Sequence, residues 1–180
     1  MNVIKQAGIY WLANAFIWTW LLLPVAPLAD LLKRDSSGAA IDHRTKTFAY
    51  FAICFCICVV WVLALPLWAS FMTAVLNIKA EDVNEVALLV RTLLPFYCCY
   101  VANCMNDSVF YGKGRTELLA LQSILTNVLV YGVAFALFEA GLFVPTLRSI
   151  ALLFGTGIAV DCCITFGLYY GLLKELGYRL

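Results

Sequence analysis

Long apolar runs without charged residues are the feature that most constrains this chain. The longest covers residues 47–76, thirty positions without Asp, Glu, Lys or Arg. A helix needs about 20 predominantly apolar residues to cross the hydrocarbon core of a bilayer. Across all 180 residues, 64% are apolar and 13% are charged, and a soluble chain of this length cannot surround several such helices. The sequence therefore predicts one all-α domain, a polytopic membrane helix bundle.

The apolar runs predict five transmembrane helices, over residues 7–29, 47–76, 86–111, 118–138 and 149–173. Pro24 and Pro27 are expected to bend or end the first helix, and Pro66 to kink the second. The stretch 30–46 is the most hydrophilic and is expected to be a loop. A signal peptide is the alternative for the first run, but the run is longer and more aromatic than a typical signal sequence.

Basic residues predict the orientation of the bundle. With the N-terminus outside, the inner side holds eight basic residues and the outer side four. By the positive-inside rule, the chain is expected to have its N-terminus out and its C-terminus in, as a multi-pass protein of a cell membrane. The inner residues are Lys33, Arg34, Arg44, Lys46, Lys113, Arg115, Lys174 and Arg179, and the outer ones are Lys5, Lys79, Arg91 and Arg148.

Asp161 is the strongest candidate functional residue, because it lies at the middle of the fifth predicted helix. An ionised carboxylate at that depth costs at least about 2.5–3.5 kcal/mol unless it is paired or hydrated. One interpretation is a cavity-lining carboxylate that exchanges a proton or a cation. The other is a hydrogen-bonded acid that joins the fifth helix to the fourth, for example through Asn127 or Thr126.

The fourth predicted helix carries polar residues at a spacing of four. Gln122 and Thr126, Ser123 and Asn127, and Asn127 and Tyr131 form such pairs, which predicts one polar stripe. Lipid does not solvate a stripe of this kind, so it is expected to face the protein interior or a wet cavity. The stripe then either bonds helices to one another or lines a pore.

Asp107 is a second candidate near the end of the third predicted helix. With Asn103 four residues earlier, it can line a cavity. The alternative is that Asp107 caps the helix or pairs with Lys113 or Arg115 in the following turn.

Several functional classes are disfavoured. The turn 112–117 is Gly-rich and basic, but it lacks the spacing and the Lys-Ser/Thr ending of a phosphate-binding loop. One histidine in the chain and no nucleophile–base set argue against an enzyme. All eight cysteines fall in apolar runs, which favours packing over metal binding. A net charge of +1 gives no reason to expect a nucleic-acid partner.

The order of these features resembles the multidrug-and-toxin-extrusion (MATE) transporter family over about residues 20–173. Residues 80–86, AEDVNEV, are similar to the family's "d-x-e-V" boundary after a long helix. Residues 111–116, YGKGRT, are similar to its inner "G-x-G-x-T-K" turn, with Glu117 in place of the usual base. The likeness extends to Ser123-x-x-x-Asn127, to the polar loop with Asp42, and to the stretch 141–145 before a Gly-rich last helix.

This resemblance implies that the chain matches helices two to six of one six-helix lobe. It implies a half-size transporter that exports an amphipathic or cationic solute by antiport against Na⁺ or H⁺, with no other cofactor. The transporter is expected to be a homo-oligomer or to pair with a second lobe, because a single lobe cannot form the two-lobed cavity. The alternatives are a non-transporting accessory or scaffold protein, an incomplete transporter fragment, and a relative of the lipid or polysaccharide flippases.

Overall fold

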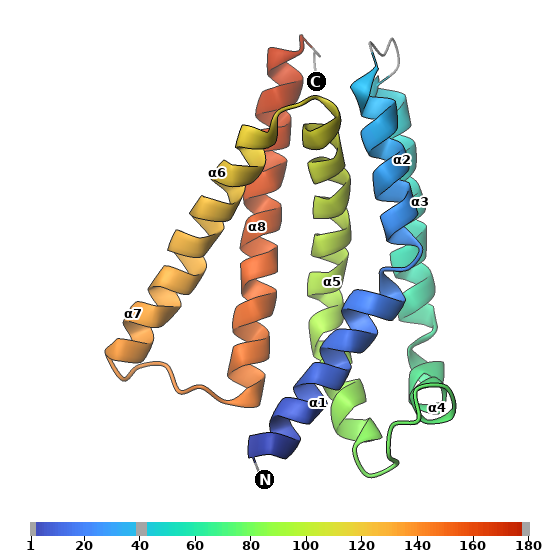
Figure 1. Cartoon of the computed structure of the whole chain (residues 1–180), viewed down its shortest axis with the longest axis vertical. Coiled ribbons are helices and arrows are strands. Elements are labelled where there is room, and N and C mark those ends of the chain that lie inside the picture. Colours follow the sequence, from blue (N-terminus) through green and yellow to red (C-terminus); the bar gives the residue numbers. More distant parts are fainter. Residues whose placement is uncertain (1–2, 39–42, 178–180) are drawn as a thin grey trace.

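The computed structural model describes residues 3–38 and 43–177, and in this part of the chain every regular element is a helix. Long helices run side by side along the long axis of the molecule, and α6–α7 diverges from α8 toward one end (Figure 1). The all-α bundle predicted from the apolar runs is confirmed. Asp42 and Arg179, used above in the family resemblance and the charge count, lie outside the described residues.

The first apolar run forms a broken helix. Helix α1 (Val3–Ala15) continues into a π-helical segment, η1 (Phe16–Leu21), and α2 (Val25–Ser37) follows at an angle of 49°. The break comes directly before Pro24, which has no N–H to continue the helical hydrogen bonding.

The prediction of a loop over residues 30–46 is wrong at both of its ends. Helix α2 continues to Ser37, and the next helix already begins at His43. The polar residues of α2 are compatible with a helix because they alternate with apolar ones that pack inward, such as the fully buried Leu32.

The second run is interrupted where Pro66 predicts a kink. Helix α3 (His43–Leu63) ends, a 3₁₀ turn (Leu65–Leu67) contains the proline, and the short helix α4 (Trp68–Ala74) follows. Helix α5 (Val83–Gly112) matches the third predicted span, although Pro95 lies inside it.

The last two runs form a helical hairpin. Helix α6 (Thr116–Thr126) passes through a second π-helical segment, η3 (Asn127–Gly132), into α7 (Val133–Glu139). Helix α8 (Leu147–Glu175) follows. Its first turn is fixed by a capping box, in which the Thr146 and Ser149 side chains each accept the backbone N–H of the other residue.

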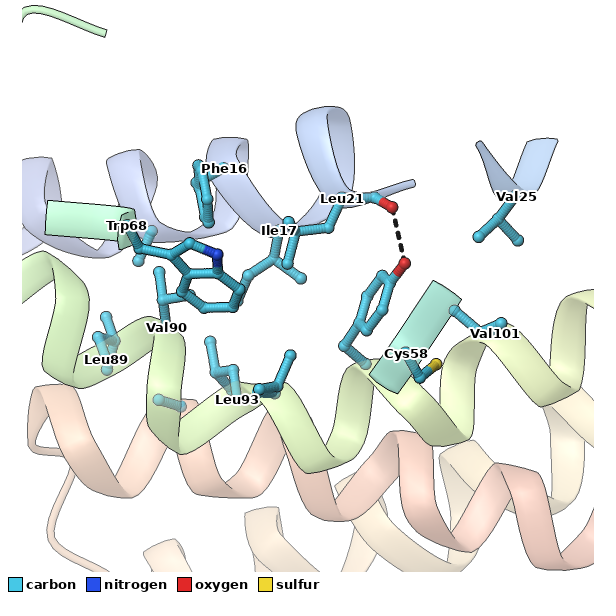
Figure 2. Packing of buried hydrophobic residues seen from close by; sticks show 14 of the residues in the cluster. Phe16, Ile17, Leu21, Val25, Cys58, Trp68, Leu89, Val90, Leu93 and Val101 are labelled. Carbon is cyan, nitrogen blue, oxygen red and sulfur yellow. Dashed lines mark hydrogen bonds between the residues drawn. The ribbon is translucent and has the colours of Figure 1, made fainter. Parts of the chain in front are cut away.

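Helix α5 lies at the centre of the apolar core. Phe16 and Ile17 of η1 and Trp68 of α4 pack against Val90 and Leu93 of α5 (Figure 2). The one hydrogen bond drawn in Figure 2 ends on the carbonyl of Leu21, which accepts the hydroxyl of Tyr97 at 2.6 Å. This bond satisfies a carbonyl oxygen at the point where the helix is broken.

Four helical stretches are long and apolar enough to cross a membrane. The number is five if the bent helix made of residues Lys5–Leu21 and Val25–Ser37 counts as one span. Residue 3 at the start of α1 and residue 177 after α8 lie at opposite ends of the bundle (Figure 1). Large apolar side chains point outward along the candidate spans, including Phe48, Leu63 and Phe135. The spans imply contact with a lipid bilayer, and the direction of insertion stays a prediction.

Candidate functional site

Asp161 is the acceptor of hydrogen bonds from two neighbouring helices. Its Oδ2 accepts the Asn103 amide of α5 at 2.7 Å and the Gln122 amide of α6 at 3.0 Å. Its Oδ1 accepts the Thr126 hydroxyl of α6 at 2.7 Å. The carboxylate of α8 therefore joins three helices within the bundle.

Asp107 lies beside this cluster, one helical turn after Asn103 on α5. The Asp161 carboxylate and the Gln122 side chain lie close enough to Asp107 to interact with it electrostatically. Among the described residues it forms no ion pair with Lys113 or Arg115, because Lys113 donates to the Gly38 carbonyl and Arg115 pairs with two glutamates. The alternative role predicted for Asp107, pairing within the basic turn, is not found.

Several polar atoms on the parts of α5 and α6 that carry Asn103, Asp107 and Gln122 are buried and lack a hydrogen-bond partner among the described residues. Most of them are oxygen atoms, and they are Asn103 Oδ1, Asn106 Oδ1 and Nδ2, Asp107 Oδ1 and Gln122 Oε1. A buried unpaired polar atom costs about 1–3 kcal/mol, so a group of them calls for water or a cation. Carboxylate and amide oxygens are the ligands that hard cations prefer.

A half-open cavity of about 400 Å³ is lined in part by Asp161. Asp161 and Thr126 line it together with four aromatic residues, Trp18, Tyr100, Tyr131 and Phe154. This volume is within the range of small-molecule sites, which are mostly apolar with a few placed polar groups.

The aromatic walls hold one another in place. The Trp18 ring meets Tyr100 and Phe154 edge to face, with ring centroids 4.9 and 5.8 Å apart. Its indole N–H donates to Asn14 Oδ1 at 2.8 Å. Contacts of this kind contribute about 0.5–1.5 kcal/mol beyond burial, so the wall is formed before any ligand arrives.

Two π-helical segments supply two of these aromatic residues. Trp18 belongs to η1 and Tyr131 to η3, and π-helical segments are frequent at functional sites. Gly157 of α8 makes room for Tyr131, because a Cβ at that position would lie 2.6 Å from the Tyr131 hydroxyl oxygen. The local departures from α-helix and a missing side chain shape this wall of the cavity.

The polar stripe predicted on the fourth helix is divided between two faces. Gln122 and Thr126 are buried, whereas Ser123 and Asn127 are exposed. Asn127 donates to the Ser123 carbonyl of its own helix at 2.8 Å and does not reach Asp161. The prediction of a single interior stripe is therefore wrong for these two residues, because consecutive positions point about 100° apart around a helix. Of the two bonding partners suggested for Asp161, Thr126 is found and Asn127 is not.

The sequence predicts neither the aromatic cavity nor the burial of Asn106. Trp18, Tyr100 and Phe154 lie on three different helical segments, and no spacing within one segment indicates that they meet. A usable signal was present for Asn106, because it follows Asn103 by one turn and precedes Asp107 within an otherwise apolar helix.

The cysteines give no indication of a metal centre. Within residues 3–38 and 43–177, no group of three or more His, Cys, Asp or Glu side chains is placed to hold a metal ion. All eight cysteines are free thiols, and Cys54, Cys58 and Cys162 are buried.

Comparison with known proteins gives no relative: no family model, no curated protein and no solved structure matches this chain.

Proposed function

We propose that the chain is a half-size membrane transporter lobe that exports an amphipathic or cationic solute by ion-coupled antiport. The observation that carries the proposal is the position of Asp161. Its carboxylate faces an aromatic cavity and is held at the same time by donors from α5 and α6. An aromatic wall with one carboxylate suits a cation that carries apolar groups, since aromatic faces attract positive charge.

The oxygen cluster supports the coupling part of the proposal. Asp107 and the unpaired amide oxygens of Asn103 and Gln122 lie next to Asp161, on the side of α5 and α6. A Na⁺ ion or a proton bound there changes the charge of the cluster that holds Asp161. Solute and coupling ion then compete for the same carboxylate, which is what antiport requires.

The broken helix supports the transport proposal as well. Discontinuous helices near the middle of the bilayer line the binding sites of many transporters. Here Trp18 and Leu22, at the break between α1 and α2, both line the cavity.

Asp161→Asn is the sharpest test, because it removes the charge and can keep the bonds. The Asn oxygen accepts from Asn103 and Gln122, and its amide donates to the Thr126 hydroxyl. We expect Asp161→Asn and Asp107→Asn to reduce efflux of a fluorescent lipophilic cation from proteoliposomes to background. The efflux is measured once with a Na⁺ gradient across the proteoliposome membrane and once with an H⁺ gradient. Glu139→Gln, which changes an exposed acid at the end of α7, is the matched control and should leave the flux unchanged.

Unchanged flux in both aspartate variants, with folding intact, would remove the role proposed for these acids. The oligomeric mass in detergent or nanodiscs is the companion measurement. A strict monomer without a partner lobe contradicts transport by alternating access, because one lobe alone does not enclose a two-sided cavity.

The hydrogen bonding of Asp161 also favours a second candidate, a non-transporting accessory or scaffold protein. Three donors already satisfy the carboxylate, and bonds between polar side chains hold many membrane helices together. This function predicts no solute flux and a stable monomer or a fixed partner. Asp161→Asn then has little effect on any measured property.

A further inference from the structure

A second cavity lies at the end of the bundle where α2 and α5 end, at the top of Figure 1. It measures about 520 Å³ and is lined by Asp30, Lys33, Arg34 and Ser37 of α2 and by Tyr111 and Gly112 of α5. None of these residues belongs to the Asp161 cavity or to the oxygen cluster, so the function of this cavity is independent of the transport proposal.

Close contact between α2 and α5 forms the floor of this cavity. A Cβ at Gly112 would lie 2.5 Å from the Lys33 carbonyl oxygen and 2.5 Å from the Ser36 Cβ. Only glycine permits this approach, and it brings the cationic side chains of α2 next to the end of α5. The basic residues at this end are therefore placed by packing and are not simply scattered in a loop.

The cavity has an excess of positive charge. Lys33 and Arg34 line it, and Lys113 reaches over to α2, where its Nζ donates to the Gly38 carbonyl at 3.3 Å. Among the described residues none of the three forms an ion pair with a carboxylate. The one acid in the lining is Asp30.

The other side of the same end of the molecule is different. Arg115 after α5 is bonded to Glu117 of α6 and to Glu175 of α8, so its charge is balanced by two carboxylates. Lys46 of α3 and Lys174 of α8 also lie at this end without a described ion pair, but neither lines the cavity, whereas Lys33 and Arg34 do.

The position of the cavity matches the headgroup region of a bilayer. It lies at the last residues of the candidate span Val83–Gly112. Tyr111 is half-exposed, and the Lys33 ammonium lies 4.9 Å above its ring. Leu31 is exposed on α2, next to the lining residues in the sequence. Tyrosine at the interface, with basic residues beside it and an apolar surface adjoining, is typical of sites where a lipid headgroup and its chain are held together.

We propose that this cavity binds the phosphate headgroup of an anionic membrane phospholipid. Lys33 and Arg34 contact the phosphodiester oxygens, with Lys113 at the rim. Guanidinium and ammonium groups form charge-assisted hydrogen bonds with such oxygens. The acyl chains extend along the apolar outer surface of α2. The bound lipid fixes the end of α2 against α5.

The experiment is native mass spectrometry of the full chain in detergent, with added phosphatidylglycerol or phosphatidylcholine. We expect the chain to retain phosphatidylglycerol and not phosphatidylcholine. The double variant Lys33→Gln/Arg34→Gln should weaken phosphatidylglycerol binding at least about tenfold, since each basic residue near an anionic surface contributes to affinity. The swapped pair Lys33→Arg/Arg34→Lys keeps the charge and should retain binding, which guards against misfolding as the cause of a loss.

The matched control is Lys46→Gln/Lys174→Gln, which removes the same charge at the same end of the bundle but outside the cavity. Binding by this control should stay within about twofold of the unchanged chain. An equal loss in the control overturns the proposal in favour of general attraction to basic residues. Equal binding of phosphatidylcholine overturns it, and so does displacement of the lipid by millimolar inorganic phosphate, which would indicate a site for a soluble anion.

Discussion

Two junctions between helices hold this bundle together in different ways. Where η1 and α4 meet α5, the contact is apolar, with Phe16, Trp68 and Val90 at its centre and one hydrogen bond from Tyr97 (Figure 2). Where α6 meets α5 and α8, the described hydrogen bonds converge on Asp161. The first junction depends on shape and the second on polar bonding.

The difference matters because lipid chains are as apolar as the core. Burying apolar side chains against one another gives little driving force in a bilayer, so close packing and hydrogen bonds decide which helices associate. The arm formed by α6, η3 and α7 diverges from α8 (Figure 1), and its side chains Val128 and Phe135 are exposed. We infer that the Asp161 cluster is what holds this arm in position.

The largest effect is expected from Asp161→Leu, which removes the acceptor at the polar junction. Three donors lose their partner, at about 0.6–2 kcal/mol for each bond, so the loss of stability should be about 2–6 kcal/mol. Thermal unfolding in detergent measures it. Asp161→Asn is the control, because an amide can keep all three bonds. If the Leu and Asn variants unfold at the same temperature, the Asp161 cluster does not hold the arm in position.

Tyr97→Phe tests the one hydrogen bond drawn at the apolar junction. Tyr97 is fully buried, and its hydroxyl satisfies the Leu21 carbonyl at the helix break. Leaving that carbonyl unpaired should cost about 1–3 kcal/mol. Tyr170→Phe, at a site 58% exposed, is the matched control and should stay within about 0.5 kcal/mol. Equal stability of both variants would indicate that packing alone secures the break.

The smallest effects are expected from substitutions at two neighbouring residues of the arm, one bonded to Asp161 and one not. Thr126→Val removes one bond to Asp161 and should cost about 0.6–2 kcal/mol. Asn127→Leu alters the next position, which is exposed and bonded only within its own helix, and should change stability by less than about 0.5 kcal/mol. Both are measured by the same unfolding assay. A larger loss for Asn127→Leu would place Asn127 at an interface between copies or with a partner.

The regular parts of the fold were predictable because they depend on local solvation. Residues 86–111 and 149–173 were predicted as spans, and α5 and α8 cover Val83–Gly112 and Leu147–Glu175. An unbroken apolar run has no other way to satisfy its backbone in lipid. The hydrophilic stretch after residue 29 was mispredicted, because charged residues are compatible with a helix whose other face packs against α5.

The candidate site was predictable only in part. Asp161 stands out because a carboxylate in the middle of an apolar span needs partners, whatever they are. Its bond to Asn103 joins positions 58 residues apart, and no periodicity relates the two. Ser123 and Asn127 were misassigned for a related reason: spacing indicates which residues share a face, but not toward which neighbour that face is turned.

The amino-acid sequence alone determines that the chain forms helices of membrane-spanning length. It also determines that these helices are interrupted near Pro24 and Pro66. Asp161, in the middle of an apolar span, must be paired or hydrated. Only the packed bundle decides that Asn103, Gln122 and Thr126 are the donors, and that aromatic residues of four helical segments line a half-open cavity beside them. The physical reason is that backbone hydrogen bonding and transfer into lipid act within one helix. The rotation and axial shift of each helix against its neighbours depend on side-chain packing across the whole bundle.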